Sequence, residues 1–171
     1  MARLRPPESA PDTVARYGVL AHAPRVLHAF LDLYGRLWRD GVVDEPTKEV
    51  MRLRNARVTG CGYCRNVRFD GARRSGLSET DVGRIDDGYA SSTLSPRRKM
   101  AIALTDVVLG RTEGVGAPLA SALAGEFTPA EIVELGVTAA LCHGFSKIAV
   151  ALGTAPDDMP VTVVPTPAPP E

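Results

Sequence analysis

The sequence predicts an all-α domain, and two observations support this. Between residues 12 and 155, apolar residues recur at spacings of three and four, with glycines and prolines bounding the runs. No alternation of strand-like and helix-like segments is present, and the few runs rich in β-branched residues are short. The chain of 171 residues is long enough for one such domain with its own core.

Several of the predicted helices have recognisable ends. Pro24 suits a first helical turn, Gly76 is a typical terminator, and Thr128 with Glu131 forms a capping-box pattern. The last predicted helix is apolar nearly all round, so we expect it to be buried, either centrally or in a subunit interface. The predicted helices cover residues 24–40, 44–59, 62–75, a short stretch from 78, 95–109, 115–124 and 128–153.

Both ends of the chain are rich in proline. Residues 1–11 contain three prolines and residues 156–171 contain six. We expect a flexible N-terminal segment and an extended C-terminal tail, because such sequences have little apolar surface to bury. The N-terminus lacks a signal-like apolar stretch, and no run approaches the roughly 18 apolar residues of a membrane span. A cytoplasmic protein is therefore expected.

The formal net charge is zero, but the charges are unevenly distributed. The first 76 residues hold 14 Lys and Arg against 8 Asp and Glu, and several arginines flank a pair of cysteines. The excess could attract anionic substrates or stabilise a thiolate, or the two halves could simply present complementary solvated faces. No basic aromatic stripe or nucleic-acid motif is present, so no nucleic-acid partner is expected.

Cys61 and Cys64 form a C-x-x-C motif at the predicted start of a helix. Both sulfurs then lie on one side of a turn, where the helix N-terminus and nearby Arg65 and Arg68 favour thiolate. This suits a nucleophilic thiolate and a second, resolving thiol. Inert buried thiols, a zinc site completed by residues 142 and 143 and a structural disulfide are the alternatives, the last disfavoured in a reducing compartment.

Three further residues are candidate participants. Glu49, on the preceding predicted helix, can face the thiols as a general base or proton relay. Tyr63 lies between the cysteines and could donate its hydroxyl or simply pack. His143 could line the pocket from the last helix as a replacement base, or be an ordinary core histidine, and Cys142 is expected in the core.

Glu49, eleven residues and then Cys61-Gly62-Tyr63-Cys64 resemble the alkyl hydroperoxidase D (AhpD) branch of the carboxymuconolactone decarboxylase superfamily. The segment around Glu49, from Lys48 to Ala56, is similar to that family's helix before the cysteines. The resemblance extends over roughly residues 14–153 and includes the long final helix.

The resemblance implies an all-α, AhpD-like domain of about six to eight helices that assembles as a trimer, hexamer or dimer. It implies that Cys61 and Cys64 cycle between dithiol and disulfide, reducing organic hydroperoxides or disulfides, with Glu49 assisting proton transfer. A thiol electron donor, either a small molecule or a protein, would complete the cycle. The resemblance implies no metal, no organic cofactor and no membrane partner.

One position departs from that pattern. The dithiol branch usually has histidine four residues after the second cysteine, where this chain has Arg68. Arginine keeps its proton and cannot act as a base, although it can hold a thiolate or bind an anionic substrate. Two alternative functions therefore stay open: a lactone decarboxylase or isomerase that needs no dithiol turnover, and a non-catalytic redox sensor.

Overall fold

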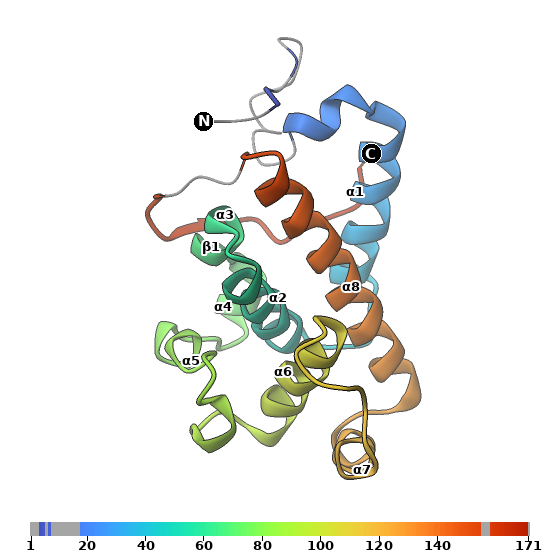
Figure 1. Ribbon diagram of the computed structural model, residues 1–171, viewed down its shortest axis with the longest axis vertical. Helices are drawn as coiled ribbons and strands as arrows, with labels where there is room; N and C mark the ends of the chain where they lie inside the picture. Colours follow the sequence, from blue (N-terminus) through green and yellow to red (C-terminus); the bar gives the residue numbers. More distant parts are fainter. Residues whose placement is uncertain (1–3, 6, 8–17, 155–157, 171) are drawn as a thin grey trace.

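The computed structural model describes residues 4, 5, 7, 18–154 and 158–170, and this part of the chain is mainly helical (Figure 1). The prediction of an all-α fold is confirmed, with one minimal two-stranded sheet added. In chain order the elements are α1 (Pro24–Arg39), α2 (Glu45–Thr59), α3 (Gly62–Asn66), β1 (Val67–Phe69), α4 (Asp70–Arg74), α5 (Glu79–Gly83), the 3₁₀ turn η2 (Tyr89–Ser91), α6 (Pro96–Val108), α7 (Ala117–Glu126), α8 (Pro129–Ala151) and β2 (Thr162–Val164).

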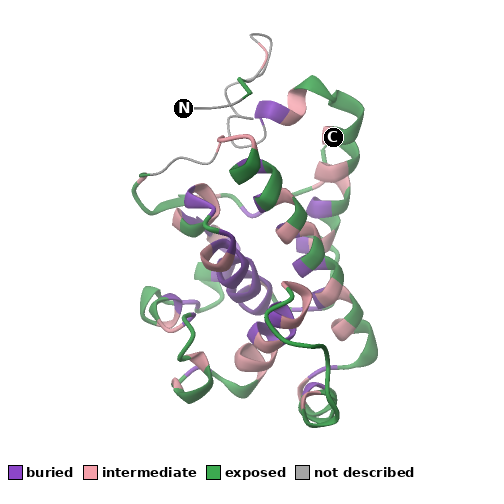
Figure 2. Ribbon diagram, viewed as in Figure 1, coloured by how far each residue is buried: buried purple, intermediate pink, exposed green. Residues whose placement is uncertain are grey.

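Helix α2 is the central element, and nearly all of its residues are buried (Figure 2). The Asp44 side chain accepts a hydrogen bond from the Thr47 amide at its N-terminus, and Gly60 ends it with a φ of 71°. Helices α6 and α8 pack against it. The apolar residues of α2 divide between two core clusters, one with α6 and α8 and one with α4 to α6. The charged side chains of so buried a helix need internal partners.

The predicted single helix over residues 62–75 is wrong. The chain forms a five-residue helix, a three-residue strand and a second five-residue helix instead. Carbonyl oxygens of Cys64 and Val67 accept hydrogen bonds from the Arg52 guanidinium of α2. Strand β1 pairs in parallel with β2, Val67 opposite Thr162. These tertiary partners satisfy backbone groups that a continuous helix would have used internally.

The C-terminal tail, expected to stay extended for lack of apolar surface to bury, packs against the domain over residues 158–170 through a short strand and polar contacts. Beyond β2, the buried Thr166 hydroxyl accepts a hydrogen bond from the Gly71 amide and contacts carboxylates of Glu45 and Asp70. A Cβ on Gly35 would lie about 2.1 Å from the tail backbone at residue 169, so glycine permits this close approach. The N-terminal segment 1–11 lies largely outside the described residues.

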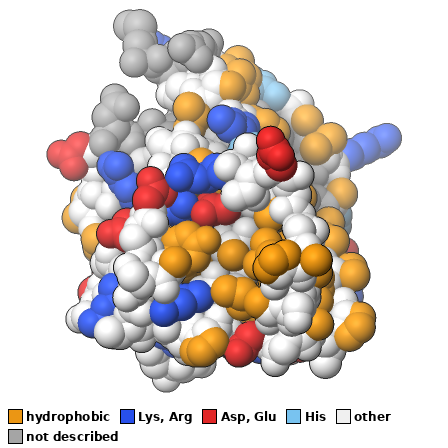
Figure 3. All heavy atoms as spheres, turned by 60° about the horizontal axis from the view of Figure 1, so that its bottom comes forward, with side chains coloured by type: hydrophobic (Ala, Val, Ile, Leu, Met, Phe, Trp, Pro, Cys, Tyr) orange, Lys and Arg blue, Asp and Glu red, His pale blue; other side chains and the backbone are white. Residues whose placement is uncertain are grey.

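Helix α8 begins at the predicted capping box, with Thr128 and Glu131 bonded reciprocally. It packs against α1, α2 and α6, yet one side of it is exposed, including Val133, Val137 and Ile148. In the described residues it is the one helix long and apolar enough to cross a membrane, a test that core helices also pass. Hydrophobic side chains also gather on the face in Figure 3, beside charged ones.

Candidate active site

The two cysteines of the motif occupy different environments. Cys61 is the N-cap residue of α3, directly after the left-handed Gly60, and is fully buried. Cys64 lies one turn later and is partly exposed. None of the cysteines, all of which lie in the described part of the chain, is joined in a disulfide. The turn at Gly60 therefore brings one thiol under the surface and leaves the other accessible.

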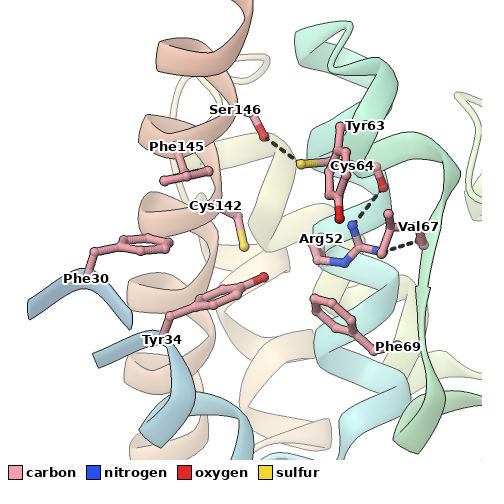
Figure 4. Close-up of a pocket in the computed structure, with 10 residues that line it drawn as sticks. All are labelled: Phe30, Tyr34, Arg52, Tyr63, Cys64, Val67, Phe69, Cys142, Phe145 and Ser146. Atoms are coloured by element: carbon pink, nitrogen blue, oxygen red, sulfur yellow. Dashed lines mark hydrogen bonds between the residues drawn. The ribbon is translucent and has the colours of Figure 1, made fainter. Parts of the chain in front are cut away.

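Cys64 lines a pocket bounded by α1, α2, α3, β1 and α8 (Figure 4). Its empty volume is about 440 Å³, including its opening to solvent. Aromatic rings dominate its walls, and Phe30 of α1 stacks on Phe145 of α8 with ring centroids 4.4 Å apart. Such aromatic walls favour an apolar organic group next to the Cys64 sulfur. The lining residues are Phe30, Tyr34, Arg52, Tyr63, Cys64, Val67, Phe69, Cys142, Phe145 and Ser146.

Cys61 and Cys142 are hard to ionise. Hydrogen bonding to Cys64 and then burial raise the pKa of Cys61 far above its usual value. Burial raises the pKa of Cys142 to about 12. The Ser146 hydroxyl donates to the Cys64 sulfur at 3.8 Å. Cys61 and Cys142 are thus held as thiols, whereas Cys64 receives a donor and faces the pocket.

Glu49 forms a buried ion pair with Arg52, three residues further along α2. Both Arg52–Glu49 hydrogen bonds measure 2.7 Å, and the two side chains are 4% and 1% exposed. The Phe69 amide donates a third bond to the Glu49 carboxylate. Burial alone would lower the pKa of Arg52, but the charge and hydrogen bonds of Glu49 raise it above its ordinary value. Glu49 is connected to Cys64 through Arg52, which holds the Cys64 carbonyl at 2.7 Å.

The structure does not bring Arg68 into the pocket. Because residue 68 lies in β1, the predicted helical i+4 relation to Cys64 is wrong. The Arg68 guanidinium pairs with Glu79 at 3.0 Å and donates to backbone carbonyls of Arg65 and Val67. These contacts hold α3, β1 and α5 together.

Tyr63 and His143 are placed differently from each other. Tyr63 does line the pocket. His143 is half-buried behind the pocket wall, with its Nδ1 3.3 Å from Oδ1 of Asn55, and burial followed by the nearby Lys147 charge lowers its pKa. Within the described residues, no group of three His, Cys, Asp or Glu side chains is arranged to hold a metal ion.

Sequence reasoning missed four residues that shape the site. Arg52 could have been found from its i, i+3 spacing to Glu49 on one helical face. Ser146 and Asn55 gave no such signal, because their partners are more than 80 residues distant in the chain. Tyr34 on α1 looked like an ordinary core residue of an amphipathic helix.

Three comparisons place this chain among known proteins. The sequence model of the carboxymuconolactone decarboxylase family matches residues 24–90. The uncharacterised protein Rv2313c of Mycobacterium tuberculosis is 30% identical over 128 residues, which are 75% of this chain and 44% of that protein. The chain thus spans less than half the length of the curated relative it matches.

The fold has a counterpart among solved structures. Protein ATU0492 of Agrobacterium tumefaciens, a protein of unknown function described as a candidate antioxidant defence protein AhpD, superposes with a TM-score of 0.66. The match covers 78% of this chain and 92% of that one at 19% identity, so it concerns the fold. The chain is therefore similar in sequence to the carboxymuconolactone decarboxylase family over residues 24–90, and its fold is AhpD-like.

Proposed function

We propose that the protein is a dithiol oxidoreductase that reduces organic hydroperoxides or disulfides through Cys61 and Cys64. One observation carries the proposal: Cys64 lines an aromatic pocket, and the fully buried Cys61 lies three residues before it at the start of the same short helix. Cys64 is therefore the attacking residue and Cys61 the resolving one. The superfamily includes enzymes, and the structural relative's description as a candidate AhpD is consistent with this chemistry.

The reaction with a hydroperoxide has two steps on the protein. The Cys64 thiolate attacks the terminal peroxide oxygen, the O–O bond breaks, and the alkoxide takes a proton to leave as an alcohol. The Cys61 sulfur then attacks the Cys64 sulfenic acid, releasing water and forming the disulfide. An external dithiol, free or on a partner protein, restores both thiols by disulfide exchange.

In this proposal Glu49 assists by holding Arg52 rather than by taking a proton directly from a thiol. Both its oxygens accept hydrogen bonds from Arg52 or from the Phe69 amide. Arg52 in turn fixes the Cys64 backbone and presents a buried positive charge to the pocket. Arg68, paired with Glu79, has a structural role.

The proposal extends to the oligomeric state and the cellular location of the protein. We infer a homo-oligomer in which the exposed apolar side of α8 is covered by another copy of the chain. A reducing cytoplasm would keep the pair as a dithiol between turnovers.

The test is consumption of cumene hydroperoxide with dithiothreitol as donor, for the wild type and for Cys64→Ser, Cys61→Ser and Cys142→Ser. Turnover should disappear in Cys64→Ser and persist in Cys142→Ser, the matched control. When hydroperoxide is added without dithiothreitol, Cys61→Ser should stop after one oxidation, leaving a Cys64 sulfenic acid that dimedone labels.

Other outcomes would contradict the proposal. Turnover that survives Cys64→Ser would assign the chemistry to another group and favour the decarboxylase-like alternative. A wild type that forms the disulfide reversibly but consumes neither hydroperoxide nor a disulfide substrate would favour a redox sensor.

A further inference from the structure

A buried polar network lies directly behind the thiols, between α2 and α8. Asn55 and Ser146 are each about 1% exposed. The Asn55 Nδ2 amide donates to Ser146 Oγ at 2.9 Å and to the Cys142 carbonyl at 3.1 Å. Ser146 Oγ donates to the Cys64 sulfur at 3.8 Å (Figure 4). The same hydroxyl also favours ionisation of Cys61.

The orientation of the Asn55 amide follows from its three partners. Its nitrogen faces a carbonyl oxygen and a hydroxyl oxygen, both of which accept hydrogen bonds. Its Oδ1 faces His143 Nδ1 at 3.3 Å, which then carries the proton. Turning the amide over would place its oxygen against the Cys142 carbonyl, so the observed assignment is the favourable one.

This orientation determines where the Ser146 proton points. A serine inside a helix ordinarily donates to the carbonyl four residues earlier, here that of Cys142. Asn55 already bonds to that carbonyl and also donates to the Ser146 oxygen. The serine hydrogen is therefore directed across the helix interface toward the two motif thiols, and the Cys64 sulfur, at 3.8 Å, is the one that faces the pocket.

We propose that Ser146 and Asn55 are positioning residues that stabilise the Cys64 thiolate: Ser146 donates the hydrogen bond, and Asn55 aims it. The proposal rests on the proposed function in taking Cys64 as the attacking thiol. Residues of α2 and α8 would then stabilise the thiolate, which Arg68 does not do because it is paired with Glu79.

Several other groups face Cys64 and contribute to its ionisation. Cys61 donates a hydrogen bond from the start of α3, and the Arg52 charge lies on α2. Cys142 on α8 and the Tyr63 phenol on α3 line the same pocket. All of them are unchanged by a substitution at Ser146, so its effect can be measured separately.

The experiment follows the rate of iodoacetamide alkylation of Cys64 against pH in the fully reduced protein, read by mass spectrometry of the Cys64 peptide. Ser146→Ala should raise the Cys64 pKa by about 0.5–1 unit and slow alkylation at neutral pH about three- to tenfold. Asn55→Ala should shift the pKa in the same direction, because Ser146 can then donate to the Cys142 carbonyl.

Thr138→Val is the matched control. Thr138 is a second fully buried hydroxyl on α8, two turns before Ser146, and its Oγ1 has no hydrogen-bond partner among the described residues. Its removal should leave the Cys64 profile unchanged. Thermal melts by circular dichroism establish that each variant is folded. Ser146→Ala removes the donor to the Cys64 sulfur, and Asn55→Ala removes the group that orients that donor.

The result that overturns the proposal is a wild-type Cys64 pKa in folded Ser146→Ala. A further shift when Asn55→Ala is added to Ser146→Ala would overturn the aiming role, since Asn55 is proposed to act through Ser146. Alkylation does not require peroxide turnover. A wild type that reduces neither a hydroperoxide nor a disulfide substrate would refute the proposed function, and the predicted pKa shift in Ser146→Ala would still leave this inference standing.

Discussion

Replacing Glu49 with glutamine tests whether this residue mainly holds the site together. The carboxylate neutralises Arg52, which is buried and directs its other hydrogens to the carbonyls of Cys64 and Val67. Glutamine has nearly the same shape, so no cavity is made. It offers one oxygen to three donors, and its own NH₂ group must face Arg52 or the Phe69 amide, both of which are donors.

The expected cost is large because the positive charge stays buried. Breaking one partner of a buried ion pair typically destabilises a protein by about 3–5 kcal/mol. The 2.7 Å bidentate geometry and exposures of a few per cent place Glu49→Gln within that range. A large part of the free energy of unfolding of an ordinary domain, about 5–15 kcal/mol, would be lost.

The assay is urea unfolding followed by circular dichroism, at a fixed protein concentration because an oligomer's stability depends on it. Asp32→Asn, which removes an exposed ion pair with Arg36, is the control and should leave the unfolding midpoint unchanged. Glu49→Gln combined with Arg52→Met should recover part of the loss, since no unpaired charge remains. A loss below about 1 kcal/mol in Glu49→Gln would refute this account of the pair and return Glu49 to the role of a proton relay.

Three other measurements test the tail, acid sensitivity and the pocket. Thr166→Val should lower the free energy of unfolding by about 1–3 kcal/mol, because it leaves the buried Gly71 amide without its acceptor; an unchanged urea midpoint would contradict this. Hydrogen bonds from Arg74 and the Thr166 amide hold the pKa of Asp70 below its usual value, so the stability they add is present above about pH 4 and is lost as pH falls. Asp70→Asn should therefore make the decline of Tm below that pH shallower, and an unaltered decline would count against it. Phe145→Ala should raise KM for cumene hydroperoxide about five- to tenfold, by loss of an aromatic contact of about 1–1.5 kcal/mol, with little change for hydrogen peroxide, and equal effects on both substrates would show that the ring does not bind the apolar group.

Helix ends were predictable from the sequence where the signal is local. The capping box at Thr128 acts within one turn of its own position, so its pattern predicted the start of α8 closely. The predicted span 44–59 likewise agrees with α2, which Asp44 and Gly60 cap. The segment after Cys64 was not predictable in this way. The predicted helix is interrupted there because the Arg52 guanidinium of α2 and strand β2, almost 100 residues later, bond to its backbone. Neither interaction changes the local spacing of apolar residues.

The packing of the C-terminal tail was also not predictable from its sequence. Its proline content correctly argued against a helix or a packed apolar core. The pairing of β2 with β1 and the buried Thr166 hydroxyl, bonded to α2 and to the start of α4, nevertheless hold it against the domain. Burial of a polar group with all its partners satisfied depends on tertiary geometry that composition does not encode.

The departure at Arg68 also has a physical explanation once β1 is recognised. A helical residue 68 would lie on the face of Cys64, and arginine there would have to replace a base that it cannot mimic. In the strand, its side chain instead binds Glu79 of α5 and two carbonyls, contacts that suit a planar cation with five donors. Apart from α3 itself, the groups beside the Cys64 sulfur come from α8 and from α2. The reactivity of this dithiol should therefore depend on how those two helices pack more than on the residues that immediately follow the motif.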